Sequence, residues 1–190
     1  MKPAKAPHEV RIIGGQWKRS KLPVADAPGL RPTPDRVRET LFNWLGQDLQ
    51  GWRCLDAYAG SGALGFEAAS RGAEAVVLIE REARLAHGLR AVQQRLKAET
   101  VRIEVADALA WMARCSPDSF ELVFIDPPFD ANVFEPALKA AARLVVPDGF
   151  IYLEADRAFD GPLLGPGLRL HRHGKAGAVH YHLIQRGMPG

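Results

Sequence analysis

Short apolar runs alternate with stretches of helical periodicity along most of this 190-residue chain. Apolar runs of strand length predict strands at 53–58, 75–80, 101–106, 120–126 and 149–155. Between them, apolar residues at helical spacing predict helices over 63–72, 83–98, 108–115 and 133–145. This alternation predicts an α/β fold, a doubly wound, Rossmann-like, mostly parallel sheet with helices on both faces.

The two ends of the chain have other patterns. Residues 10–22 predict a short β-hairpin around Gly14 and Gly15, and a Pro-rich stretch follows it. Thr33 is a candidate N-cap, with Pro34 at the first position of a helix that runs to about residue 48. At the other end, 168–174 and 179–185 predict an antiparallel hairpin on the sheet's edge. We therefore expect a basic arm over 1–32 and a larger domain over 33–190.

Basic residues are concentrated at the two ends, although the formal net charge is only +3. Residues 1–38 hold nine Lys or Arg against three Asp or Glu, and residues 157–190 hold five against one. The middle, 39–156, holds eleven against eighteen, so the three segments carry +6, +4 and −7. Basic ends around an acidic body favour contact with a polyanion. The alternative is that these ends are simply solvated.

Composition also bears on the compartment. No apolar run approaches the about 20 residues that span a bilayer, and the N-terminus has no continuous apolar segment typical of a secretion signal. The two cysteines, Cys54 and Cys115, form neither a disulfide framework nor a metal-binding spacing. These features predict a cytoplasmic protein without a membrane partner.

The turn after the first predicted strand carries Gly60, Gly62 and Gly65, which fit the pattern G-x-G-x-x-G before a helix. Glycines allow a ligand to approach the backbone, and the helix N-terminus offers unpaired N–H groups. Glu80 ends the next strand twenty residues after Gly60, where a carboxylate can accept from ribose hydroxyls. The pattern predicts a nucleoside-containing ligand; close packing of the helix alone is the structural alternative.

Two aspartates favour S-adenosylmethionine over NAD as that ligand. Asp56 stands four residues before Gly60, where a carboxylate would repel a pyrophosphate but can accept from a cationic amine. Asp107 follows the third strand of the series, where it can meet an adenine edge or cap the next helix. An NAD-dependent oxidoreductase is the alternative, but hydride transfer has no evident use for the motif described next.

The stretch "LVFIDPPF" ends a buried strand with Asp126, two prolines and Phe129. The carboxylate of Asp126 and the carbonyl of Pro127 can each accept one N–H of a planar exocyclic amine, which would make its nitrogen more nucleophilic. Phe129 can stack on a base, and the prolines hold these groups in fixed relation. We therefore expect methyl transfer to an amine, with Asp126, Pro127 and Phe129 as the catalytic residues.

Several stretches together carry a family resemblance: "RIIGGQWKRSKL", "RPTPDRVRETLFNWL", "CLDAYAGSGALGFEAASRGA" and "LVFIDPPF". They resemble the bacterial 16S rRNA (guanine(966)-N(2))-methyltransferase family, called RsmD, among the class I S-adenosylmethionine-dependent methyltransferases. The resemblance implies methylation of a guanine N2 amine in 16S rRNA, within an assembling or assembled 30S subunit, by a monomer. The implied cofactor-binding residues are Asp56, Tyr58, Gly60, Gly62, Glu80, Arg81, Asp107 and Ala108.

The RNA-binding candidates are basic or aromatic residues of the arm and of the chain entering the first helix. They are Arg11, Trp17, Lys18, Arg19, Lys21, Arg31, Arg36 and Arg38. For any one of them a solvated side chain is an alternative to a phosphate contact. The same amine chemistry on an adenine N6 or a glutamine amide, and a non-catalytic RNA-binding protein, are the remaining functional alternatives.

The histidines of the C-terminal hairpin form a separate feature. A four-residue loop over 175–178 would place His173 opposite His180 and His171 opposite His182, with all four on one face. Such a face could bind a transition metal, but no carboxylate or cysteine accompanies it. We therefore expect no metal.

Overall fold

The computed structural model describes residues 8–28, 30–129 and 132–188. Its strands alternate with helices through the middle of the chain, as the apolar pattern predicts. In chain order the elements are β1 (Glu9–Arg11), β2 (Lys21–Pro23), α1 (Asp35–Leu45), β3 (Arg53–Asp56), α2 (Ala63–Ser70), β4 (Ala75–Glu80), α3 (Ala83–Leu96), β5 (Val101–Val105), α4 (Ala108–Arg114), β6 (Phe120–Ile125), α5 (Phe134–Leu144), β7 (Val145–Ala155), a short 3₁₀ helix (Gly161–Leu164), β8 (Leu168–Ala176) and β9 (Val179–Arg186).

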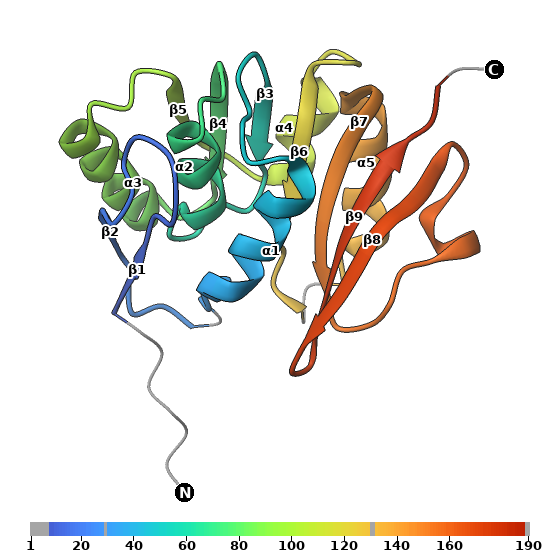
Figure 1. Ribbon diagram of the computed structural model, residues 1–190, viewed down its shortest axis with the longest axis horizontal. Helices are drawn as coiled ribbons and strands as arrows, with labels where there is room; N and C mark the ends of the chain where they lie inside the picture. Colours follow the sequence, from blue (N-terminus) through green and yellow to red (C-terminus); the bar gives the residue numbers. More distant parts are fainter. Residues whose placement is uncertain (1–7, 29, 130–131, 189–190) are drawn as a thin grey trace, which may run out of the picture.

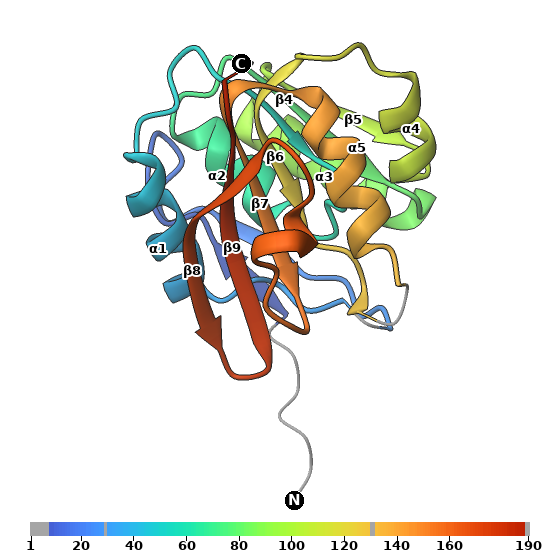
Figure 2. The same ribbon diagram turned by 90° about the vertical axis from the view of Figure 1, so that its right-hand side faces the viewer.

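The main sheet has seven strands in the order β5-β4-β3-β6-β7-β9-β8. The first five run parallel, and β9 pairs antiparallel with both β7 and β8. Figures 1 and 2 show the parallel strands ending at the lower edge, where the β8–β9 hairpin also has its tip. This confirms the predicted α/β class, with its parallel sheet and antiparallel C-terminal hairpin. Ligands of such sheets bind beyond the carboxyl ends of the strands, so the lower edge is where a site is expected.

Two apolar cores lie on opposite faces of the sheet. One contains residues of α2 and α3, together with Leu41 and Phe42 of α1. The other contains residues of α4 and α5, such as Met112 and Leu138. Side chains alternate between the two cores along each central strand: Leu122 and Phe124 face the first, and Val123 and Ile125 face the second.

The N-terminal arm forms a second, two-stranded sheet in which Val10 pairs with Leu22. Both side chains are buried in the first core, next to residues of α1 and α2. The arm therefore packs against the larger sheet through apolar contacts. The division into 1–32 and 33–190 stays a prediction, and residues 1–7 and 29 lie outside the described residues.

Two local predictions were wrong. The N-cap of α1 is Pro34, and the hydroxyl of Thr33 donates instead to Glu154 Oε1 at 2.8 Å. The C-terminal hairpin turns at residues 177–178, because Ala176 pairs with Val179 and Gly177 adopts a positive φ of 59°. The shorter turn shifts the register, so that His173 lies opposite His182 and Lys175 lies opposite His180.

Gly65 and Gly88 give opposite predictions for the same substitution. A Cβ at Gly65 would lie 2.1 Å from Leu78 Cδ2, whereas a Cβ at Gly88 would have no neighbour within 4 Å. We expect Gly65→Ala to destabilise the fold by about 1–3 kcal/mol through overpacking. Gly88→Ala, inside α3, should stabilise it by roughly 0.5–1 kcal/mol because alanine favours helix. Urea unfolding of both variants measures this difference, and equal effects would contradict it.

Candidate active site

The glycine-rich turn and the end of β4 lie against each other, as their spacing predicts. Glu80 Oε2 accepts the N–H of Gly60 at 3.0 Å, and Oε1 accepts the N–H of Glu82 at 3.0 Å. Gly60 and Gly62 adopt positive φ values of 55° and 79°, which favour glycine. A Cβ at Gly60 would lie 2.8 Å from Leu30 Cδ1, so the chain entering α1 passes close over this turn.

Asp56 is buried beneath the same turn, with 1% of its surface exposed. Its Oδ2 accepts the N–H of Gly65 at 3.0 Å, whereas Oδ1 has no hydrogen-bond partner in the described part of the chain. Burial raises the pKa of Asp56 to about 7, and the charges of Glu80 and Glu154 add to that rise. An unpartnered buried acceptor of this kind fits a cationic amine donor from a ligand.

The raised pKa of Asp56 predicts a pH-dependent stability. From pH 3.8, the ordinary value, to about 7, the folded protein holds a proton that the unfolded chain has released. The stability that this group contributes is therefore present below pH 3.8 and is lost as pH rises to about 7. The free energy of unfolding should fall by up to about 4 kcal/mol over this range. Asp56→Asn should flatten this decline, measured by urea unfolding at pH 5 and pH 8. Asp148→Asn, an exposed control, should keep the wild-type decline.

Asp107, expected at the adenine, follows β5, and Tyr58, another expected cofactor-binding residue, follows β3. Asp107 is the N-cap of α4 and accepts the N–H of Ala110 at 2.9 Å, which confirms the capping interpretation. Burial, and then the charge of Asp107, raises the pKa of the half-buried Tyr58 to about 12, which places these two side chains near each other. Ala108 is buried, while Arg81 and Asp107 are exposed.

Asp126 follows β6 at the same edge and lies among other acidic side chains. Burial raises the pKa of Asp126 well above its ordinary value, and the nearby carboxyl groups of Glu154 and Asp56 raise it further. Pro127 is buried, and Phe129 is 37% exposed with its ring edge-on to Phe134 at a centroid distance of 5.8 Å. The exposed ring and the aspartate thus lie at one edge with the glycine-rich turn.

Glu154 and Tyr152 were missed from the sequence. Glu154, near the end of β7, is 6% exposed, and its Oε1 accepts from the hydroxyls of Tyr152 at 2.7 Å and Thr33 at 2.8 Å. A signal was present, because Glu154 ends the apolar run "FIYLEA" as Asp56 and Asp126 end theirs. Carboxylates at the ends of β3, β6 and β7 therefore form one cluster.

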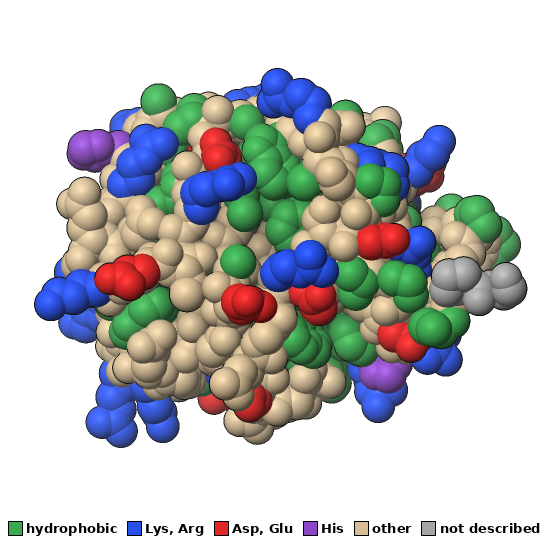
Figure 3. Space-filling model, turned by 90° about the horizontal axis from the view of Figure 1, so that it is seen from above, with side chains coloured by type: hydrophobic (Ala, Val, Ile, Leu, Met, Phe, Trp, Pro, Cys, Tyr) green, Lys and Arg blue, Asp and Glu red, His purple; other side chains and the backbone are tan. Residues whose placement is uncertain are grey.

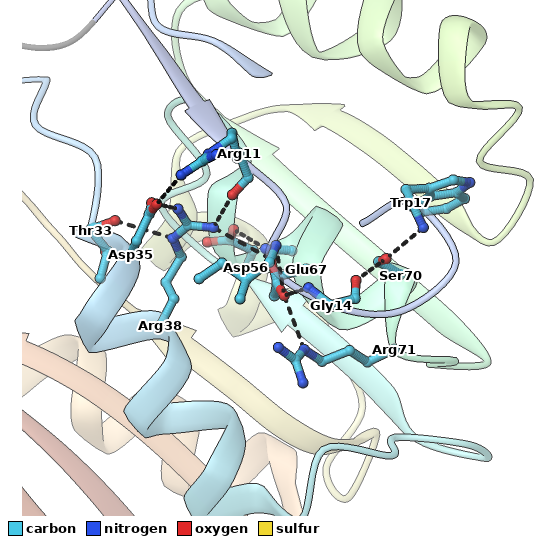
Figure 4. Close-up of polar contacts among 12 residues, drawn as sticks. Arg11, Gly14, Trp17, Thr33, Asp35, Arg38, Asp56, Glu67, Ser70 and Arg71 are labelled. Atoms are coloured by element: carbon cyan, nitrogen blue, oxygen red, sulfur yellow. Dashed lines mark hydrogen bonds and ion pairs between the residues drawn. The ribbon is translucent and has the colours of Figure 1, made fainter. Parts of the chain in front are cut away.

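Arg38 contradicts the expected contact with RNA. Its side chain is fully buried and donates to the carbonyl oxygens of Thr33 and Arg11 and to the carboxylate of Asp35. Its Nη1 also forms an ion pair with Oε2 of Glu67 in α2, at 3.4 Å; the contact is drawn in Figure 4. The periodic apolar face of α1 accounts for this burial, since Arg38 lies one turn before Phe42. Arg38 therefore joins α1 to the arm and to α2.

The other predicted RNA contacts lie at or near the surface. Arg11 is 3.8 Å from Asp35, and Lys21 is 3.4 Å from Glu9, each in a solvent-exposed ion pair. The side chain of Trp17 packs partly against the first core, and its backbone N–H donates to the hydroxyl of Ser70 at 3.0 Å (Figure 4). The side chains of Lys18, Arg19, Arg31 and Arg36 are exposed.

The opposite edge of the sheet carries a mixed surface. Figure 3 shows acidic and basic side chains interspersed among apolar and neutral ones on that face. Within the described ranges, none of the helices is long and apolar enough to cross a membrane.

Three histidines of the hairpin, His173, His180 and His182, form contacts within the fold. His182 is fully buried: its Nε2 accepts the N–H of Phe159 at 2.9 Å, and its Nδ1 lies 3.0 Å from the carbonyl oxygen of Leu153. Burial lowers the pKa of His182 to about 4. Both of its ring nitrogens are engaged, so it has none free for a metal. His173 and His180 stack nearby, with Nε2 and Nδ1 3.0 Å apart.

Comparison with known proteins connects this chain to methyltransferases. A family model described as "Conserved hypothetical protein 95" matches residues 10–185. The protein named "Ribosomal RNA small subunit methyltransferase D" of Escherichia coli (strain K12) is 41% identical over 184 residues, 96% of this chain and 92% of that protein. The protein of the same name from Haemophilus influenzae is 41% identical over 183 residues, 93% of this chain and 94% of that protein.

The solved structures agree. A putative methyltransferase from Escherichia coli superposes with a TM-score of 0.84 at 39% identity, covering 94% of this chain and 98% of its own. A putative methylase from Haemophilus influenzae gives a TM-score of 0.77 at 37% identity, covering 95% and 99%. The resemblance seen in the sequence motifs is confirmed, and the chain belongs to the RsmD family, that of ribosomal RNA small subunit methyltransferase D.

Proposed function

We propose that the protein transfers a methyl group from S-adenosylmethionine to the exocyclic N2 amine of a specific guanine in 16S rRNA. The observation that carries this proposal is the meeting, at one edge of the sheet, of the Gly60–Glu80 contact with Asp126 and its Pro-Pro-Phe sequence. The names of the relatives support rRNA as the substrate. The proposed setting is the bacterial cytoplasm, with a monomeric enzyme acting on an assembling or assembled 30S subunit.

Several residues at this edge are suited to hold the methyl donor. When bound, S-adenosylmethionine supplies a methyl group activated by a sulfonium. Asp56, with its unpartnered Oδ1, is proposed to accept from the amine of the methionine end. Glu80 is already aligned by two backbone N–H groups and has lone pairs left for ribose hydroxyls. Gly60 and Gly62 are proposed to allow close approach, with Tyr58, Arg81, Asp107 and Ala108 around the adenine.

The motif after β6 is proposed to hold the target base. The carboxylate of Asp126 and the carbonyl of Pro127 accept the two N–H groups of the amine. Phe129, exposed at the edge, stacks on the base face, an interaction worth roughly 1–3 kcal/mol in single-strand binders. The two consecutive prolines, Pro127 and Pro128, limit the movement of this segment, so the chain contributes mainly by positioning.

The arm is proposed to bind the RNA around that base. Arg11, Trp17, Lys18, Arg19, Lys21, Arg31 and Arg36 remain candidates, and Arg38 is withdrawn because it is buried. A base in a duplex must be extruded to reach such a pocket, and unpaired bases are easier to extrude. Phosphate contacts from the arm would fix the register of the RNA without reading its sequence.

The test is methyl transfer from labelled S-adenosylmethionine to small ribosomal subunits and, separately, to their free RNA, followed by nuclease digestion and nucleoside analysis. N2-methylguanosine at one site is the expected product. Label in adenosine, DNA or a glutamine amide would retain the methyl donor and overturn the substrate. Binding of nicotinamide cofactors in place of S-adenosylmethionine would overturn the reaction class.

A further inference from the structure

Asp126 has a neighbouring carboxyl group whose position the strand pairing fixes. β6 and β7 run parallel with Ile125 opposite Leu153, so Asp126, just after β6, and Glu154, within β7, come next to each other. After burial, the charge of the Glu154 carboxyl group and its hydrogen bonding with Asp126 are the largest causes that raise the pKa of Asp126. Both side chains lie on the face of the sheet that carries α1, because the side chains of Phe124 and Tyr152, two residues earlier, face that core.

Neutral hydroxyl groups donate to Glu154. Its Oε1 accepts from Thr33 at 2.8 Å and from Tyr152 at 2.7 Å, and both of those residues are at least 96% buried. Asp56 on β3 is the third carboxyl group near the pair. Among the ion pairs formed within the described part of the chain, none includes Asp56, Asp126 or Glu154.

Ionising two neighbouring, buried carboxyl groups at the same time is unfavourable in free energy. Each negative charge opposes the other, so a proton shared between the two carboxyl groups relieves the repulsion. The hydroxyls of Thr33 and Tyr152 fill one oxygen of Glu154, which leaves its other oxygen for the hydrogen bond with Asp126. The pair then carries one negative charge.

We propose that Asp126 and Glu154 act as a carboxyl–carboxylate pair that holds one proton before methyl transfer and takes up the proton that the substrate amine releases. Glu154 does not touch the base; it is a positioning residue that acts through Asp126. This inference rests on the proposed function and deepens it. It also assigns a role to Thr33, whose hydroxyl donates to Glu154. Thr33 belongs to the stretch "RPTPD" that leads into α1.

The protons and charges balance. The nitrogen of the substrate amine forms a bond to the methyl carbon. The bond between that methyl carbon and the sulfonium sulfur breaks, and its electron pair stays on sulfur, which becomes neutral. One N–H bond of the amine breaks, and its electron pair stays on the nitrogen. The proton passes to Asp126, so the pair changes from one proton and one negative charge to two protons and no charge. One proton then leaves to solvent, which restores the pair.

The first experiment observes the carboxyl groups directly, without substrate or cofactor. In ¹³C NMR of carboxyl-labelled protein, with Asp126→Asn used for assignment, Asp126 should show a titration step well above the ordinary carboxyl range. In Glu154→Gln, which keeps an acceptor for both hydroxyls, that step should fall by about one pH unit or more. Glu99→Gln, in an exposed turn before β5, is the matched control and should leave the titration unchanged.

The second readout separates rate from binding. Glu154→Gln should lower the single-turnover rate by about 100-fold while the Kd for S-adenosylmethionine and the KM for RNA change less than about threefold. Thr33→Val covers the case in which Glu154→Gln does not fold. It removes a donor to the charged pair, so the step should move further upward in pH.

The outcomes separate the inference from the proposed function. An unchanged Asp126 titration in Glu154→Gln, or in Thr33→Val if only that variant folds, overturns the pair. A shifted titration with an unaltered transfer rate overturns its role in the reaction. If the titration shifts as expected but no RNA is methylated, the pairing of the carboxyl groups is supported and the proposed substrate is wrong.

Discussion

Asp126→Asn is expected to slow methyl transfer to RNA by about 10²- to 10⁴-fold. Asparagine has nearly the same shape but no negative charge, and its amide presents donors where the substrate amine needs an acceptor. The binding of S-adenosylmethionine should change less than about threefold, because the glycine-rich turn and Glu80 do not depend on Asp126. Single-turnover methylation and calorimetric titration of the methyl donor measure the two effects separately.

Asp148→Asn is the matched control for this variant. Asp148 is exposed early in β7, far along the strand from Glu154, and its φ of 62° is one that asparagine tolerates. It should leave both the rate and the affinity unchanged. A collapse of cofactor affinity in Asp126→Asn would instead show that Asp126 faces the methyl donor, and the proposed clamp for the amine would be wrong.

The fold could be predicted because its central strands are apolar on both faces. The run at 75–80 became β4 without a change of boundary, and 101–106 and 120–126 became β5 and β6 with one residue fewer. Buried strands of a parallel sheet leave a continuous apolar signal, and helical periodicity separates them. The differences lie at turns and at the ends of elements: a two-residue turn at Gly177 replaced a four-residue loop, and β7 begins at Val145 instead of 149.

Parts of the site could be predicted for a similar reason. The contact between Gly60 and Glu80 follows from the twenty-residue spacing of a strand–helix–strand unit. The cap at Asp107 follows from a local rule. Each of these contacts lies within one unit of the chain, or between neighbouring strands of the sheet.

The site predictions that failed involve polar partners that are far apart in the sequence. Thr33 and Glu154 are separated by 121 positions, and Arg38 and Glu67 by 29. A charged residue in a sequence is expected at the surface, so Arg38 was assigned to RNA. Its place on the buried stripe of α1, and a glutamate inside the apolar helix "ALGFEAAS", were the two signals that together indicate a buried ion pair.

Glu67 is the residue on which this buried network depends. Its carboxylate is fully buried and accepts the N–H groups of Ile13 and Gly14, each at 2.9 Å. It also lies 3.0 Å from Arg71 and 3.4 Å from Arg38, so one side chain of α2 contacts the arm and α1 together (Figure 4). Ser70, one residue before Arg71, adds a second link, since its hydroxyl donates to the carbonyl oxygen of Gly14.

Glu67→Gln should destabilise the protein by about 3–5 kcal/mol, because it leaves Arg71 without a counter-charge and Arg38 with only Asp35. For a chain of this size the midpoint of thermal unfolding should fall by roughly 10 °C. Calorimetry measures the midpoint, and the amide protons of Ile13 and Gly14 should exchange faster, since they lose a charged acceptor. Glu74→Gln, at an exposed position after the same helix, should stay within about 0.5 kcal/mol of wild type. A loss below about 1 kcal/mol in Glu67→Gln would show that the apolar contacts of Val10 and Leu22 hold the arm without this network.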